Sequence, residues 1–199
     1  MLPPPLKNLA DLLTTLPSIG PRQAMRLAFY IVNLGKSRIA DFATAFQHIA
    51  DVKPCAQCFF IHNNAGGFCS ICANPNRRSD VIAIVEKETD LISLERSKRF
   101  DGCYLVLGEL KRGGVLDELQ TLKLNHLRSR VQKLPNHVAH EIILAISPTT
   151  SGDLSAAVIV QSLQNVATRF TRLGRGLPTG GEIEFADEET LAQAFDNRG

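Results

Sequence analysis

The chain has 199 residues, of which 44% are apolar and 21% charged, and its formal net charge is +2. This composition is typical of a globular protein with one large or two small domains, and it excludes a chain that is disordered throughout. Residues 1–80 carry eight Lys and Arg against four Asp and Glu, whereas residues 177–199 carry one Arg against six acids. This distribution favours nucleic-acid contact near the N-terminus, if anywhere.

The N-terminal stretch MLPPPLKNLADLL is broken by prolines and lacks the apolar region of a secretion signal. No apolar run elsewhere in the sequence approaches the roughly 18 residues that a membrane-spanning helix needs. We therefore expect a cytoplasmic protein without a membrane partner, in a compartment where glutathione disfavours structural disulfides.

A helix-hairpin-helix is predicted near the N-terminus. Leucines recur at helical spacing over residues 4–16, the sequence PSIG interrupts them, and a second helix begins at Pro21, a residue suited to a first helical turn. Backbone N–H groups at the start of such a helix can bind a phosphate, and Gly20, Arg22 and Arg26 lie beside them. The alternative is an ordinary helical hairpin with two solvated arginines.

A third amphipathic stretch, residues 38–51, leads into a cluster of four cysteines, and these are Cys55, Cys58, Cys69 and Cys72. Two Cys-x2-Cys pairs separated by ten residues can surround a Zn²⁺ ion with four thiolates. The alternatives are disulfides, which need an oxidising compartment, and thioredoxin-like redox chemistry, which normally uses one such pair. The spacing therefore predicts one Zn²⁺ per chain, with a structural role because four cysteines leave no open coordination position.

Two further potential metal ligands are assigned other roles. His62 lies between the cysteine pairs without a second His at ligand spacing, which favours a solvated loop residue. Cys103 lies in an apolar stretch and is predicted to be a small core residue. The metal site is therefore expected to use the four clustered cysteines alone.

After Asp80 the sequence alternates between apolar runs and helical patterns. The runs predicted as strands are VIAIVE (81–86), CYLVLG (103–108), EIILAIS (141–147) and the more polar ATRFTRLG (167–174). The helical patterns cover residues 88–97, 115–133 and 152–166. This alternation predicts an α/β fold with a mostly parallel sheet. The tail is expected to add a short edge strand and a helix capped by Asp187 or Glu188.

Acidic residues follow the predicted strands at their carboxyl ends, where functional groups of open α/β sheets gather. Glu86 ends the first strand, Asp90 lies one turn into the next helix, and Asp153 follows the third strand. Convergent carboxylates can hold Mg²⁺ for phosphoryl chemistry. The alternative for Asp90 and Asp153 is helix N-capping.

Six blocks, in this order and spacing, resemble the bacterial RecR family of recombination proteins along nearly the whole chain. They are LPSIGPRQAMRLAF (16–29), the knuckle CAQC…CSIC, VEKETDLISLE (85–95), FDGCYLVLG (100–108), EIILAISPTTSGD (141–153) and RLGRGLPTGGEIEFADEETLAQAFDNR (172–198). The resemblance implies an α/β protein with an N-terminal helix-hairpin-helix and four-cysteine zinc knuckle. A Toprim-type, mostly parallel sheet with flanking helices and a short C-terminal strand and helix follow.

The resemblance and the change of sequence pattern after Asp80 together predict the domain boundaries. We expect a helix-hairpin-helix DNA-binding module at 1–53, a zinc finger at 54–78, a Toprim domain at 79–174 and a C-terminal segment at 175–199. The main division of the chain is expected near residue 78, between a zinc-stabilised helical module and the sheet.

The resemblance also implies a non-catalytic, DNA-binding mediator of recombinational repair. Such proteins act with RecO and RecF to load RecA at gaps and damaged DNA, and they assemble into rings that can encircle DNA. A homo-oligomer, between a dimer and a tetrameric ring, is therefore expected. The family's phosphate-contacting positions fall on Arg22 and Arg26, and its Toprim acids fall on Glu86 and Asp153, which with Asp90 form a partner-binding face.

The chain departs from the family pattern at the Toprim face. Where the family usually has Thr-Asn-Pro-Thr-x-Glu-Gly-Glu, residues 146–153 read ISPTTSGD, so that one acid is missing and Asp153 is a shortened one. The hairpin begins with Ser18 in place of a glycine. Two other functions stay open: a Mg²⁺-dependent Toprim nuclease using Glu86 and Asp153, and a zinc-stabilised protein–protein adaptor whose hairpin does not contact DNA.

Overall fold

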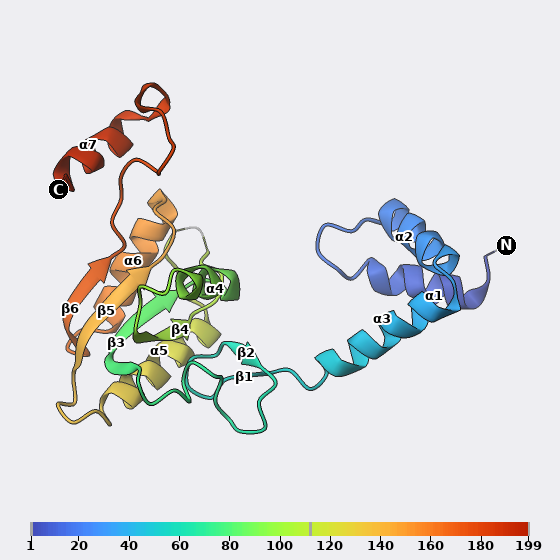
Figure 1. The fold of residues 1–199 in the computed structure, drawn as a ribbon, viewed down its shortest axis with the longest axis horizontal. Helices are drawn as coiled ribbons and strands as arrows, with labels where there is room; N and C mark the ends of the chain where they lie inside the picture. Colours follow the sequence, from blue (N-terminus) through green and yellow to red (C-terminus); the bar gives the residue numbers. More distant parts are fainter. Residues whose placement is uncertain (1, 112, 199) are drawn as a thin grey trace. The chain divides into compact units, whose positions relative to one another are not determined.

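The computed structural model of the protein describes residues 2–111 and 113–198, which form two compact units that divide between Val52 and Lys53. The first unit contains three helices, which are α1 (Pro4–Leu13), α2 (Pro21–Asn33) and α3 (Lys36–Ile49) (Figure 1). The elements of the second unit, in chain order, are β1 (Lys53–Pro54), β2 (Ile61–His62), β3 (Arg78–Val85), α4 (Glu88–Arg96), β4 (Gly102–Val106), α5 (Glu118–Val131), β5 (Ala139–Ala145), α6 (Thr150–Ser162), β6 (Ala167–Arg172), the 3-10 helix η1 (Ile183–Phe185) and α7 (Glu188–Asp196).

In the first unit, α1 and α2 pack through small apolar side chains. The buried residues are Leu6 and Ala10 of α1 and Ala24 and Ala28 of α2. Small residues allow two helices to approach closely, and this contact forms the predicted helical hairpin. α3 has no buried residue, so the core of this unit comes from α1 and α2.

The second unit is built on a four-stranded sheet of order β4-β3-β5-β6, in which all three strand pairings are parallel. Parallel neighbours need crossover connections, and the helices α4, α5 and α6 provide one after each of the first three strands. The predicted α/β fold with a mostly parallel sheet is therefore confirmed.

One face of the sheet packs against α5 and α6. Its core contains Ile84 and Leu105 from the strands, together with Leu127 of α5 and Ile159 of α6, and all four side chains are fully buried. The apolar runs that predicted the strands supply these residues because a parallel sheet is covered on both faces.

The opposite face packs against α4 and the cysteine-rich segment. Val85 and Tyr104 of the sheet share a core with Leu91 of α4 and with buried cysteines such as Cys58. The cysteine segment therefore belongs to the sheet unit, whereas the sequence placed the main division near residue 78. The division differs from the predicted one because the buried cysteines pack in the same hydrophobic core as the sheet residues.

The predicted edge strand near the C-terminus is replaced by the 3-10 helix η1. Phe185 N–H donates to the Glu182 carbonyl and Ala186 N–H donates to the Ile183 carbonyl, both at 3.2 Å. The alternating sequence EIEF suggested a strand. It has no neighbouring strand to pair with among the described residues, so its backbone groups bond locally.

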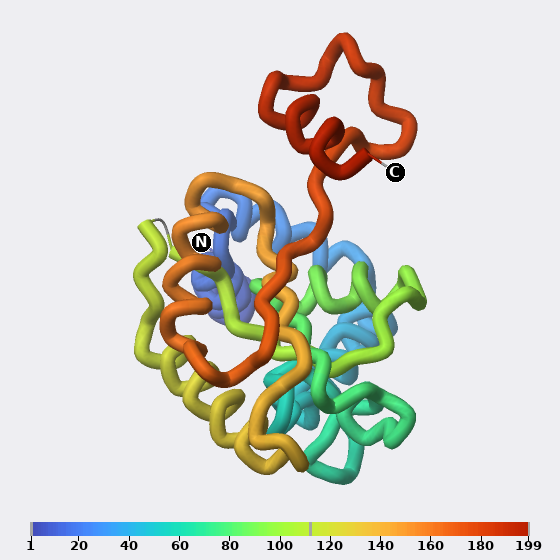
Figure 2. The backbone as a smooth tube through the Cα atoms, turned by 90° about the vertical axis from the view of Figure 1, so that its left-hand side faces the viewer, coloured from blue at the N-terminus to red at the C-terminus, as the bar shows by residue number. Residues whose placement is uncertain are grey.

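The terminal helix α7 forms as predicted. Asp187 is its N-cap, and its carboxylate accepts a hydrogen bond from Thr190 N–H at 2.8 Å. Asn197 Nδ2 donates to the Arg175 carbonyl at 3.0 Å, so the C-terminal segment folds back on itself between these two residues (Figure 2). Across the described ranges, 2–111 and 113–198, no helix is both long enough and apolar enough to cross a bilayer.

Candidate functional site

The hairpin of the first unit leaves the start of α2 uncapped. The N-cap is Gly20, which has no side chain to accept a hydrogen bond, and Pro21 has no N–H. The first helical bond runs from Ala24 N–H to the Gly20 carbonyl at 2.9 Å, so the N–H groups of Arg22 and Gln23 precede the helical ladder. Two such N–H groups at the positive end of a 13-residue helix suit an anion.

The two predicted arginines lie beside this helix start. Arg22 and Arg26 are one turn apart on α2, and both are exposed. Neither belongs to an ion pair within the part of the chain that the structure describes. Ser18 has a φ of 65°, a left-handed conformation that favours glycine, and it keeps the turn tight without one. The structure therefore brings Gly20, Arg22 and Arg26 together at one helix start.

The four clustered cysteines converge in the second unit. The four Sγ atoms all lie within 4.8 Å of one another. The Sγ atoms of Cys58 and Cys69 are 3.6 Å apart, and all five cysteines of the chain are thiols outside disulfides. Within residues 2–111 and 113–198, this is the only group of three or more His, Cys, Asp and Glu side chains close enough to share a metal ion.

The chemistry of these thiols fits a divalent cation. A hydrogen bond from Cys72 lowers the pKa of Cys58 to about 6, whereas burial raises the pKa of Cys69 to about 11 and the hydrogen bond with Cys58 raises the pKa of Cys72. These opposite shifts indicate that Cys58, Cys69 and Cys72 disfavour ionising together, and a divalent cation among them would stabilise their thiolate forms. Backbone N–H groups also point at sulfur, as from Cys69 to Cys55 at 3.4 Å, which favours thiolates.

The other two potential ligands lie outside the cluster. Cys103 is buried in β4 with 5% of its surface exposed, as predicted. His62 belongs to β2, where its Nδ1 accepts from Asn64 N–H at 3.1 Å and its Nε2 is buried without a hydrogen-bond partner in the described structure. The prediction of a solvated loop residue is wrong for His62, because β2 folds its ring against the protein.

The cysteine segment is joined to the sheet and to α5. Val106 N–H of β4 donates to the Cys58 carbonyl at 2.8 Å. The next residue, Phe59, places its ring 5.3 Å from the His126 ring of α5, edge to face, and 5.3 Å from Lys123 Nζ. Lys123 Nζ in turn donates to the Val106 carbonyl at 3.0 Å. The only sequence signal for these contacts is the pair of aromatic residues that follows Cys58, and it did not lead to their prediction.

Two of the predicted acids lie where β3 runs into α4. Asp90 accepts a hydrogen bond from Lys87 N–H at 3.0 Å and so completes a capping box at the start of α4. Glu86 is half-buried, and its burial, followed by the nearby Asp90 and Glu109 carboxylates, raises its pKa. Asp90 therefore has the capping role that was its alternative, and the carboxylates repel one another without converging.

Asp153 makes different contacts. It lies in the first turn of α6, whose N-cap is Thr149, and its carboxylate is paired with Arg172 and Arg175. The two guanidinium groups hold the pKa of Asp153 below its usual range. Arg175 also lies 3.8 Å from Glu189 of α7, so the pairs connect α6 to the C-terminal segment.

The sequence around Arg172 and Arg175 is typical of a turn-rich connection, and neither arginine was predicted to have a role. Two cations three residues apart at the end of a strand were the available signal.

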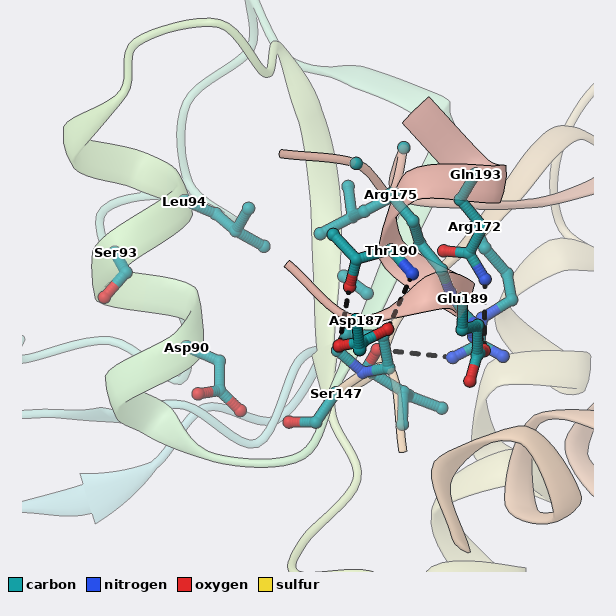
Figure 3. A pocket seen from close by; sticks show the side chains of 16 residues that line it. Asp90, Ser93, Leu94, Ser147, Arg172, Arg175, Asp187, Glu189, Thr190 and Gln193 are labelled. Carbon is teal, nitrogen blue, oxygen red and sulfur yellow. Dashed lines mark hydrogen bonds and ion pairs between the residues drawn. The ribbon is translucent and has the colours of Figure 1, made fainter. Parts of the chain in front are cut away.

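A cleft of about 530 Å³ lies between α4 and the C-terminal segment. Figure 3 shows Asp90 and Ser93 on the α4 side and Asp187, Glu189 and Arg175 on the opposite side. Its floor is the end of β5. The cleft thus unites Asp90 with the arginines that bind Asp153, whereas Glu86 is not among its lining residues.

Comparison with known proteins matches three family models along the chain. They are the RecR helix-hairpin-helix at residues 6–50, the Toprim domain at 80–174 and the RecR C-terminal region at 176–198. Relatives described as recombination protein RecR include those of Frankia alni (37% identity over 97% of this chain and 95% of the relative), Rubrobacter xylanophilus (37%, 94% and 92%) and a Synechococcus species (38%, 97% and 98%).

Proposed function

The chain belongs to the RecR family of recombination proteins, and from this premise we propose that it is a non-catalytic, DNA-binding mediator of recombinational repair. In this role it acts with RecO and RecF to help load RecA at gaps and damaged DNA. The observation that carries the proposal is the uncapped start of α2 beside the exposed Arg22 and Arg26. These groups suit phosphate and make no contact that distinguishes one base from another.

A ring or dimer supplies the affinity that one weakly charged chain lacks. Several copies of each arginine pair then contact one DNA molecule, and each added contact is intramolecular. The four-cysteine cluster holds one structural Zn²⁺ per chain in this proposal, through Cys55, Cys58, Cys69 and Cys72. Glu86, Asp90 and Asp153 belong to a face that binds protein partners.

Two observations favour this role over that of a Mg²⁺-dependent nuclease. The Asp153 carboxylate is paired with two arginines, which occupy the position that a cation would take. No group of three or more carboxylates in residues 2–111 and 113–198 lies close enough together to share a metal ion. Nicking of DNA by pure protein with Mg²⁺, abolished by Glu86→Gln, is the result that revives the nuclease.

The test is DNA binding by the wild type and by the double variant Arg22→Ala, Arg26→Ala, over a salt series and at measured oligomeric state. Each phosphate contact adds about 0.9 to the magnitude of the slope of log K against log salt on duplex DNA. The magnitude of this slope should therefore be smaller for the double variant than for the wild type by about 1.8 per bound chain. A control, Lys7→Ala with Lys36→Ala, removes the same charge from exposed positions of the same unit. Equal slopes for the two double variants refute the hairpin as the phosphate contact.

A further inference from the structure

An arginine whose side chain is mostly buried fixes the backbone that follows α4. Arg77 Nη1 donates to the carbonyls of Phe100 and Gly102 at 3.0 and 3.1 Å, and its Nη2 pairs with Glu95 of α4. The other Glu95 oxygen accepts from the buried Tyr104 hydroxyl at 2.9 Å. Only 13% of the Arg77 side chain is exposed. Residues 97–101, between these contacts, are therefore held at both ends.

Four cations lie in or beside this anchored stretch. Arg96 ends α4, Lys98 and Arg99 follow it, and Arg78 N–H donates to the Asp101 carbonyl at 2.9 Å, which places the start of β3 alongside. All four are exposed. Arg78 pairs with an acid, but the other three belong to none of the ion pairs in the described structure. We call these four residues the α4 basic patch.

Favourable interaction with the helix dipole explains only part of the α4 basic patch. A cation in the last turn of a helix is stabilising, and Arg96 has that position. The effect falls off within that turn, so it does not account for Lys98, Arg99 or Arg78. Lys98 also adopts a φ of 54°, an unfavourable conformation for a residue with a side chain. Arg78 has its ion pair with Asp80, but local stability does not explain the cations at Lys98 and Arg99.

The patch lies at the opposite edge of the sheet from Glu86, and the sheet acid beside it is Asp80, 3.3 Å from Arg78. Because β3 and β4 are parallel, both begin at the edge that carries the patch, and Glu86 follows β3 at the other edge (Figure 1). The eight residues of β3 separate the two edges by roughly 23 Å, about two to three Debye lengths at physiological salt. A polyanion at the patch is thus screened from Glu86, whereas Asp90 lies six residues before Arg96 on α4, about 9 Å along the helix axis and roughly one Debye length away.

From these observations we propose that the α4 basic patch is a second contact surface for the nucleic-acid backbone, in the sheet unit and separate from the hairpin. This proposal rests on the proposed function, since it extends a DNA-binding role to the second unit. Unpaired Arg and Lys side chains on a fixed backbone suit phosphates. The neighbouring aromatic ring, Phe100, is half-buried against Tyr104 with 5.0 Å between the ring centroids, so it does not stand free to stack on a base. The contact is therefore independent of sequence.

The experiment measures binding of full-length protein to a 30-nucleotide oligo-dT strand and a 30-base-pair duplex over a salt series. The patch variant is Arg96→Gln, Lys98→Asn, Arg99→Gln, in which Asn suits the left-handed conformation of residue 98. The control variant changes three other exposed cations of the same unit to Gln, and these are Lys111, Lys133 and Arg198. Thermal unfolding checks that both variants keep the stability of the wild type.

We expect the patch variant to lower the salt slope by about 2.7 on duplex and about 2.1 on the single strand, and the control to leave it unchanged. The loss adds to that of the Arg22→Ala, Arg26→Ala variant, because the two surfaces lie in separate units. Patch and control variants with the same slope overturn the proposal while the hairpin effect persists. Loss of binding to an acidic peptide without loss of DNA binding also overturns it and assigns the patch to a protein partner. If the wild type itself binds no DNA, the proposed function fails and this proposal fails with it.

Discussion

Loss of the metal from the four-cysteine cluster is expected to loosen the nearest strand of the sheet, because the two share a core. The perturbation is Cys58→Ser, or a chelator acting on wild-type protein. Val106 N–H bonds to the Cys58 carbonyl, whereas Leu107 N–H bonds to the Val85 carbonyl within the sheet, both at 2.8 Å. Adjacent amides thus report separately on the cysteine segment and on the sheet.

The magnitude follows from the contacts that the segment makes. The hydrogen bond from Val106 contributes about 1 kcal/mol, the edge-to-face contact of Phe59 with His126 about 0.5–1.5 kcal/mol and the contact of Phe59 with Lys123 about 0.5–1 kcal/mol. Loss of all three contacts lowers the free energy of local opening by roughly 2–3.5 kcal/mol. The Val106 amide then exchanges with solvent roughly 30- to 400-fold faster.

The assay is residue-resolved hydrogen exchange on zinc-loaded protein, on chelator-treated protein and on the Cys58→Ser variant. Cys103→Ser is the matched control, since this thiol is buried in β4 outside the cluster and should leave zinc content and Val106 exchange unchanged. The reasoning is refuted if Val106 stays as protected as Leu107 after the metal is removed. Full thermal stability and one zinc per chain in Cys58→Ser refute the four-thiolate site itself.

Three further predictions concern the hairpin and the acids. Arg175 and Arg172 lower the pKa of Asp153, so the ion pairs of Asp153 stabilise the fold above its unfolded pKa of about 4 and are lost as pH falls through its folded pKa. The rate of limited proteolysis of the C-terminal segment should therefore rise below about pH 4. The Asp153→Asn variant should show the faster proteolysis already at pH 7. Burial raises the pKa of Glu86, so the ionised carboxylate is less favourable in the folded chain than in the unfolded chain. At pH 7, Glu86→Gln should therefore keep or raise the midpoint of thermal unfolding. A fall in that midpoint contradicts the reasoning. Ser18→Gly removes a left-handed serine and should stabilise the chain by about 0.5–1 kcal/mol in denaturant unfolding, whereas destabilisation shows that the turn is unstrained.

The elements of the protein were largely predictable because their signals are local. Pro21 begins α2, Asp187 caps α7, and the apolar runs after Asp80 form the parallel strands. The cysteine spacing alone predicted the convergence of the four thiols. Each of these features depends on residues that are close in sequence or on a spacing with one chemical explanation.

The contacts between elements were not predictable, because they join residues far apart in sequence. Phe59 meets α5 more than sixty residues later, and Asp153 meets Arg172 only because β5 and β6 pair. The alternating sequence EIEF at 182–185 is typical of a strand, but a local pattern does not show whether a partner strand lies beside it. Tertiary context decided all three cases.

The position of β4 at the end of the sheet gives the proposed Zn²⁺ ion a second expected role, in solubility. An outer strand presents unpaired N–H and C=O groups that recruit strands of other molecules, and β4 is apolar along its whole length. The cysteine segment covers part of this strand at Val106. The opposite outer strand, β6, is protected by charge, since it carries Arg169 and Arg172. Zinc-depleted protein should therefore aggregate through β4 before its sheet unfolds, and chelators and thiol oxidants should act on the colloidal stability of the protein first.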